Sequence, residues 1–128
     1  MHEFSLMEAT LELVSELVPT HSIDQIISLT LRVGEASGVV PEALGFAFEA
    51  LAEQLPYSSA KLKIELVPVR CCCQSCQFTF APESFIYECP NCGNLHAEVL
   101  QGKELELVSI ELDSWNSLSP APVSMELN

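Results

Sequence analysis

The chain has 128 residues, of which 18 are Asp or Glu and five are Lys or Arg, so its formal charge at pH 7 is −13. Proteins that bind nucleic acid draw most of their affinity from Lys and Arg on phosphates, so this charge argues against nucleic acid as a partner. We expect cationic partners instead, either basic proteins or metal ions. No apolar run approaches the ~20 residues of a membrane helix, so no membrane partner is expected.

The N-terminus lacks the features of a secretory signal. Its first residues, Met1-His2-Glu3-Phe4, have no basic region followed by a hydrophobic stretch. All six cysteines fall between residues 71 and 92, and such clustering in a chain without a signal favours metal binding over disulfides. We therefore expect a cytoplasmic protein with a metal-binding module.

Two segments have the periodicity of amphipathic helices. Residues 5–18 end before Pro19, and Ser5 with Glu8 fits a capping box, which predicts a start beside the N-terminus. Residues 41–55 begin with Pro41, which suits a first helical position. The expected apolar positions are Leu6, Leu13, Val14 and Leu17 in the first helix and Leu44, Phe48, Leu51 and Leu55 in the second.

Three segments have the character of β-strands. Residues 25–33 and 61–67 alternate apolar and polar side chains, which is typical of half-buried strands. Residues 104–112 form a third strand, whose apolar parity shifts at Leu107-Val108 and indicates either a bulge or burial on both faces. The apolar positions of the first two strands are Ile27, Leu29, Leu31 and Val33, then Leu62, Ile64 and Leu66.

The cysteine-rich segment lies between the second and third predicted strands. Two strands rarely form a stable sheet alone, so we expect the last strand to return to the sheet that the segment interrupts. The predicted fold is α+β, with two helices packed on a small three-stranded sheet and an inserted four-cysteine zinc-ribbon-like module. The predicted domains are 1–69 with 103–113, then 70–102, and a Ser/Pro/Ala-rich, poorly ordered tail at 114–128.

Four cysteines have the spacing of a metal site. Cys73 and Cys76 form one Cys-x-x-Cys pair, and Cys89 and Cys92 form a second one twelve residues later. Pairs so separated can place four thiolates around a tetrahedral Zn²⁺. Four sulfurs close the coordination shell, which indicates a structural ion and argues against a zinc enzyme.

The first cysteine pair is less regular than the second. Gly93 follows Cys92 as in a zinc knuckle, whereas Gln77 stands at the corresponding place after Cys76. Cys71 and Cys72 precede the first pair, so ligand exchange through one of them remains open beside the simpler alternative of two spare thiols.

The first residues offer a second donor set. The α-amine of Met1 and the amide and imidazole nitrogens of His2 can form fused chelate rings around one ion, which suits Ni²⁺ or Cu²⁺ in tetragonal geometry. The fourth donor would be the amide or the carboxylate of Glu3. The alternative is that His2 is an exposed residue of a frayed terminus.

Several segments together resemble the HypA/HybF family of hydrogenase nickel-incorporation proteins over roughly residues 1–112. They are the start MHEFSL, the segment VGEASGVVPE at 33–42, the four cysteines, and GKEL with SIEL near the end. The resemblance implies a nickel metallochaperone, not an enzyme, for maturation of nickel–iron hydrogenase. It implies transferred Ni(II) on Met1, His2 and Glu3, and structural Zn(II) on Cys73, Cys76, Cys89 and Cys92.

The resemblance also implies partners. A HypB-type GTPase would supply the nucleotide hydrolysis for which this chain has no phosphate loop, and the hydrogenase large subunit would receive nickel. In some organisms the family also serves urease, so urease maturation proteins are further candidates, as is a second copy of the chain in a homodimer. Some members place an aspartate near nickel at the start of the second helix, where this chain has Val40, with Glu42 two residues on.

Two rival classes stay open from the sequence. One is a zinc-ribbon adaptor that recognises a protein or nucleic acid without transferring nickel. The other is a metalloenzyme, which would need an open position on zinc that four sulfurs do not leave.

Overall fold

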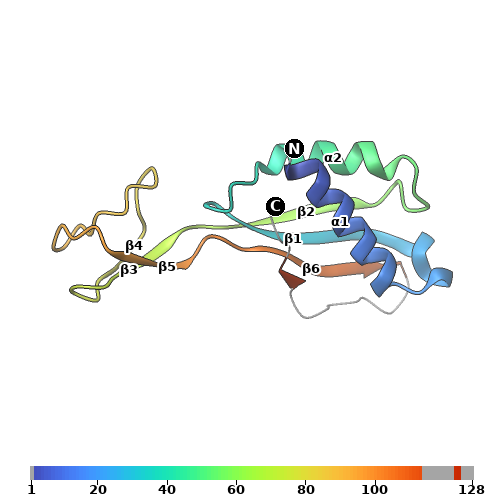
Figure 1. Cartoon of the computed structure of the whole chain (residues 1–128). Coiled ribbons are helices and arrows are strands. Elements are labelled where there is room, and N and C mark those ends of the chain that lie inside the picture. Colours follow the sequence, from blue (N-terminus) through green and yellow to red (C-terminus); the bar gives the residue numbers. More distant parts are fainter. Residues whose placement is uncertain (1, 114–122, 125–128) are drawn as a thin grey trace.

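An α+β domain and a smaller cysteine-rich lobe make up the described chain, residues 2–113 and 123–124 of a computed structural model. Helices α1 (His2–Leu17) and α2 (Pro41–Ala52) lie beside the main sheet, and the lobe projects from one end of it (Figure 1). The predicted α+β class with two main helices is confirmed. No helix in this described part is long and apolar enough to cross a membrane.

The main sheet has the strand order β2-β1-β6-β7. Strand β1 (Ile26–Gly34) pairs in parallel with β2 (Lys61–Val67), which requires a crossover connection, and α2 supplies it. Strand β6 (Leu105–Leu112) lies antiparallel to β1 on the other side. The chain therefore leaves the sheet at the end of β2, forms the lobe, and returns through β6, as the insertion prediction requires.

Part of the predicted tail joins this sheet. Strand β7 (Val123–Ser124) pairs antiparallel with β6, opposite Leu107 and Glu106. The rest of the tail, 114–122 and 125–128, lies outside the described residues, as does the prediction that it is poorly ordered. The three predicted strands are thus β1, β2 and β6, with β7 as a two-residue addition.

The main core fills the space between the helices and the sheet. Leu29, Leu31, Leu107 and Ile110 of the sheet are fully buried there, and Leu44 and Phe48 of α2 pack against them as predicted. Fully burying one such side chain stabilises a fold by about 1.5–3 kcal/mol.

The buried face of α1 agrees in part with the predicted one. Of the predicted positions, Leu6 and Val14 are buried and Leu13 packs against the core, but Leu17 is exposed. The sequence did not predict the burial of Met7 and Leu11. The helix also starts at His2, so Ser5 lies inside its first turns and the capping-box prediction is wrong. A short 3₁₀ helix, η1 (Thr20–Gln25), which the sequence did not predict, connects α1 to β1.

A bulge explains the parity shift in the last long strand. Ser109 pairs with Thr30, but Leu107 pairs with the next residue, Leu31, so Val108 is the extra residue of β6. The bulge returns the side chains on both sides of Val108 to the buried face, since Leu107 and Ile110 are both fully buried. Of the two alternatives that the sequence left open, the bulge is therefore correct.

Two predicted core positions are exposed. A second register shift, between Ile26 and Ser28, turns Ile27 away from the core, and Ser28 is buried instead. The hydroxyl of Ser28 donates a hydrogen bond to the Glu111 carboxylate at 3.0 Å, which satisfies it there. Leu66 is exposed because it lies on the edge strand β2 close to where the chain leaves for the lobe.

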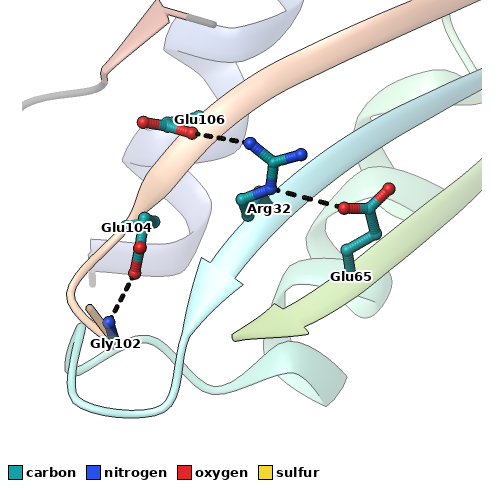
Figure 2. A network of polar contacts seen from close by, with 5 residues as sticks. All are labelled: Arg32, Glu65, Gly102, Glu104 and Glu106. Carbon is teal, nitrogen blue, oxygen red and sulfur yellow. Dashed lines mark hydrogen bonds and ion pairs between the residues drawn. The ribbon is translucent and has the colours of Figure 1, made fainter. Parts of the chain in front are cut away.

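Arg32 ties three strands together on the sheet face that carries polar side chains. Its guanidinium lies 3.3 Å from the Glu65 carboxylate on β2 and 3.4 Å from the Glu106 carboxylate on β6 (Figure 2). Each such partly exposed pair contributes at most about 1 kcal/mol, so their main effect is to align strand ends beside the lobe. Nearby, the N–H of Gly102 donates to the Glu104 carboxylate at 2.7 Å (Figure 2).

The cysteine-rich lobe has its own small sheet, in the order β4-β3-β5. Its strands are β3 (Arg70–Cys73), β4 (Thr79–Phe80) and β5 (Ala97–Gln101), with β3 in the middle and antiparallel to both neighbours. A small core packs within it, formed by Val69, Cys71, Cys73, Phe80 and Cys89.

Backbone contacts join the lobe to the α+β domain. The N–H of Gly34 donates to the carbonyl of Glu104 at 2.7 Å, and the N–H of Ala36 donates to the carbonyl of Gly102 at 2.7 Å. A Cβ on Gly34 would overlap the Gly102 carbonyl group, and Ala36 packs against the core of the lobe. The two backbones can approach this closely only because Gly34 has no side chain.

We predict that Gly34→Ala lowers the free energy of unfolding by about 1–3 kcal/mol or more, because backbone has to move to admit the methyl group. The matched control is Gly45→Ala in α2, where a Cβ meets nothing within 4 Å. That change should raise stability by about 0.5–1 kcal/mol, since alanine is the better helix former. Urea unfolding followed by circular dichroism measures both free energies. Equal stability of the two variants would contradict the close approach of the Gly34 backbone to Gly102.

Candidate metal centre

Four cysteines converge at the tip of the lobe. Cys73 ends β3, Cys76 lies in the turn that follows, and Cys89 and Cys92 lie in the segment before β5. Their sulfur atoms all lie within 4.8 Å of one another, with 3.5 Å between Cys73 and Cys92 and 3.7 Å between Cys76 and Cys89. A tetrahedral ion with metal–sulfur distances of about 2.3 Å needs sulfurs about 3.8 Å apart. The donor set therefore fits one tetrahedral ion, and the structure brings together all four cysteines that the spacing predicted.

Two similar turns present the sulfurs. The N–H of Gln77 donates to the carbonyl of Cys73 at 2.9 Å, and the N–H of Gly93 donates to the carbonyl of Cys89 at 2.8 Å. Gln77 and Gly93 both have positive φ, 67° and 77°. Glycine adopts this conformation without cost, whereas a residue with a Cβ does so with strain. The first turn thus reproduces the knuckle geometry even though glutamine occupies the place of glycine.

Neighbouring groups bias the ionisation of these thiols. The side-chain amide of Asn91, 3.5 Å from the Cys76 sulfur, is the main cause that lowers the pKa of Cys76 to about 6. The backbone N–H of Asn94 lowers the pKa of Cys92, but hydrogen bonds with nearby thiols, that of Cys73 first, raise it to about 12. The Cys76 thiolate therefore forms readily, whereas the raised pKa of Cys92 keeps that thiol protonated until a cation compensates the negative charge. Asn91 was not predicted from the sequence, where its only signal is its place inside the second Cys-x-x-Cys pair.

The two additional cysteines lie outside the four-sulfur group. Cys71 is fully buried in the lobe core, and burial raises the pKa of its thiol despite the opposing charge of Lys103. The Cys72 sulfur is 3.7 Å from the carbonyl oxygen of Cys73, to which its thiol donates. This arrangement favours the spare-thiol alternative over ligand exchange.

The predicted nickel donors lie at the start of α1. Met1 is outside the described residues, and His2 is the first residue of the helix. One carboxylate oxygen of Glu3 accepts a hydrogen bond from the N–H of Val40 at 3.1 Å, which places the start of α1 beside the start of α2 (Figure 1). The first four N–H groups of an α-helix have no intrahelical acceptor, so a metal on the amide of His2 would break no helical hydrogen bond.

We predict that Gln77→Gly stabilises the lobe by about 0.5–1 kcal/mol, because removing the Cβ relieves the cost of positive φ. The reciprocal change Gly93→Ala should destabilise it by about 1–2 kcal/mol. Metal binding and folding of such a module are coupled, so the two changes should shift affinity for Zn²⁺, used as the probe ion, in opposite directions. Competition with a chromogenic chelator measures the affinity for Zn²⁺. A weaker affinity in Gln77→Gly would contradict the claim that the positive φ of Gln77 is strained.

Comparisons with known proteins agree with this geometry. A family model described as "Hydrogenase/urease nickel incorporation, metallochaperone, hypA" matches residues 1–112. The chain is 45% identical over 112 residues to the hydrogenase maturation factor HypA of Picosynechococcus sp., covering 88% of this chain and 99% of the relative. It is 34% identical over 113 residues to HypA of Desulfitobacterium hafniense, with 88% and 99% covered.

Two solved structures are also similar. The solution structure of the nickel metallochaperone HypA from Helicobacter pylori superposes with a TM-score of 0.59 at 28% identity, covering 88% of this chain and 97% of that one. A second solution structure of a HypA protein gives a TM-score of 0.63 at 27% identity, with 88% and 96% covered.

Proposed function

Because the chain belongs to the HypA family of nickel-incorporation metallochaperones, we propose that it binds Ni²⁺ at Met1, His2 and Glu3 and delivers it during maturation of nickel–iron hydrogenase. The family is non-catalytic, so nickel is cargo and no substrate is transformed. The observation that carries the proposal is the family match, which runs from residue 1 through residue 112 and so includes the Met-His-Glu start.

The donors of the nickel site are the α-amine of Met1, the amide and imidazole nitrogens of His2, and one group of Glu3. The hydrogen bond between the Glu3 carboxylate and Val40 supports the amide of Glu3 as the fourth donor, because the carboxylate has a structural role at the start of α2. Four nitrogen donors in one plane suit Ni²⁺. All of these donors belong to the first three residues of the chain, and such a short chelate suits an ion that has to be released.

We assign Zn²⁺ to the four-cysteine site. Thiolates select soft or borderline ions, and tetrahedral four-sulfur geometry is typical of structural zinc. The separations between the four sulfur atoms support this assignment. Resident zinc would shape residues 70–102 as a binding domain, while residues 1–69 with 103–113 would form the nickel domain.

The partners follow from the transfer reaction. A HypB-type GTPase would supply nucleotide hydrolysis, and the hydrogenase large subunit would accept the ion. The family description names urease beside hydrogenase, so urease maturation proteins are a second destination. We propose that nickel transfer takes place in the cytoplasm. A homodimer of this chain is a further proposed assembly.

We predict that His2→Ala abolishes nickel binding at the N-terminus without changing zinc content, because the two donor sets share no residue. Cys89→Ser should do the reverse, losing zinc and unfolding the lobe. Glu3→Gln is the matched control, since it keeps the amide nitrogen and should retain nickel. Isothermal titration of untagged protein, with its N-terminus verified by mass spectrometry, measures nickel, and atomic emission measures zinc.

Tight nickel binding by His2→Ala would place the site elsewhere. Loss of nickel in Glu3→Gln would assign the fourth donor to the carboxylate.

We predict that nickel affinity falls steeply on mild acidification. In model compounds the α-amine titrates at about 7.7–8.0 and the imidazole at about 6.5, and each must be deprotonated to bind metal. Protons therefore compete more strongly as pH falls through this range, and affinity rises again as pH increases. Titrations at pH 6.0, 7.0 and 8.0 test this, and an unchanged affinity at pH 6.0 would exclude the amine and imidazole as ligands.

A further inference from the structure

A strained turn lies in the lobe, in the segment between β4 and β5. The N–H of Ile86 donates to the carbonyl of Glu83 at 2.9 Å, and the two residues between them, Ser84 and Phe85, have φ of 50° and 61°. Two consecutive positive φ values are typical of a type I′ turn, which strongly favours Asn-Gly or Gly-Gly. Serine and phenylalanine adopt it only against their own preference. Local stability therefore does not explain why this turn carries Phe85.

The turn exposes apolar side chains instead of burying them. Phe85 is 54% exposed and Ile86 is 62% exposed, and neither belongs to the small core of the lobe. Apolar side chains that gather on a surface with polar residues around them mark interaction sites. An aromatic side chain at the tip of a turn is a suitable anchor for a pocket on a partner.

A hollow of about 590 Å³ lies next to this turn. Its apolar lining includes Phe80, Pro82 and Ile86, and the carboxyl-bearing residues Glu83 and Glu88 also line it. A long cationic side chain fits such a site, because its aliphatic stem can lie along the apolar lining while its charged head meets a carboxylate.

The charge of the lobe restricts what can bind there. Residues 71–102 contain no Lys or Arg and include Glu83, Glu88 and Glu98. A surface of this kind repels phosphate, which argues against nucleic acid and anionic lipid. A protein with Lys or Arg around an apolar pocket is complementary in both charge and polarity.

We propose that the turn 83–86 and the adjoining hollow form a docking surface for a protein that receives Phe85 in an apolar pocket and inserts a Lys or Arg side chain into the hollow. The exposed turn, the positive φ values and the lack of Lys and Arg between Arg70 and Lys103 support it independently of the nickel ligands. The surface gives the lobe a role in recognition that goes beyond nickel carriage.

The test places the photo-crosslinker p-benzoylphenylalanine at Ile86 of the full-length, zinc-loaded chain in cells that express it. Irradiation should give one protein adduct, whose crosslinked peptide has apolar residues beside Lys or Arg. Phe85→Gly and Glu83→Lys should each lower the yield by about tenfold or more, as expected for residues that anchor an interface. The matched controls Phe46→Ala and Glu49→Lys, both at exposed positions of α2, should change it less than about twofold.

A stability measurement separates docking from folding. Glycine is relaxed at positive φ, so Phe85→Gly should raise the melting temperature of the zinc-loaded chain while it lowers crosslinking. Crosslinking that is unchanged in Phe85→Gly, or an adduct with lipid, nucleic acid or a second copy of this chain, would overturn the proposal. Nickel titration of the same variants should be unaffected, so failure of the docking surface and failure of the nickel site give different results.

Discussion

The close approach of the Gly34 backbone to residues 102–104 is the constraint on which the rest of the structure depends. Here the N–H groups of Gly34 and Ala36 bind carbonyls of the strand that returns from the lobe. The outgoing and the returning strand both pass this point (Figure 1), so the lobe is connected to the sheet through hydrogen-bonded backbone and not through flexible linkers. The ion pairs of Arg32 lie two residues away on the same strand and hold the three strands in line where the lobe begins (Figure 2).

This arrangement separates two kinds of donor chemistry within one short chain. Sulfur donors gather in the lobe, on turns that bring four cysteines within 4.8 Å. The nitrogen donors of the proposed nickel site belong to the start of α1, which the Glu3–Val40 hydrogen bond holds against α2. Soft thiolates and compact nitrogen chelates prefer different ions, so the type of donor atom alone would direct different metals to the two sites. On the proposed assignment, a closed sulfur shell would release its ion less readily than an open N-terminal chelate, and this difference would separate a resident metal from cargo.

The sequence predicted the elements better than their faces. Hydrophobic period located both helices, with Pro19 marking the end of the first and Pro41 the start of the second, although α2 ends at Ala52 and not at the predicted residue 55. The bounds of the predicted strand 61–67 are those of β2. The predicted face of α1 was right at Leu6 and Val14 and wrong at Leu17, because leucine content does not say which stripe of the helix meets the sheet. The predicted burial of Ile27 was wrong because a register shift cannot be read from local alternation. Cysteine spacing predicted the four-sulfur group, because ligand geometry restricts spacing directly. Asn91 and the positive φ of Gln77 were not predictable, since each depends on contacts that only the assembled turns provide.

The positions of strain suggest what the structural metal does for this protein. Among the described residues, the three non-glycine residues with positive φ, namely Gln77, Ser84 and Phe85, all lie in the lobe. A strained backbone conformation persists only where the surrounding contacts hold it in place. The core of the lobe is small, so it supplies few such contacts. Four metal–sulfur bonds would supply the missing constraint, because Cys76 directly precedes Gln77, and Cys89 follows the strained pair by a few residues. On this argument a metal on the four cysteines would stabilise the lobe as a whole and would also hold Phe85 in the exposed position that a relaxed turn would not impose.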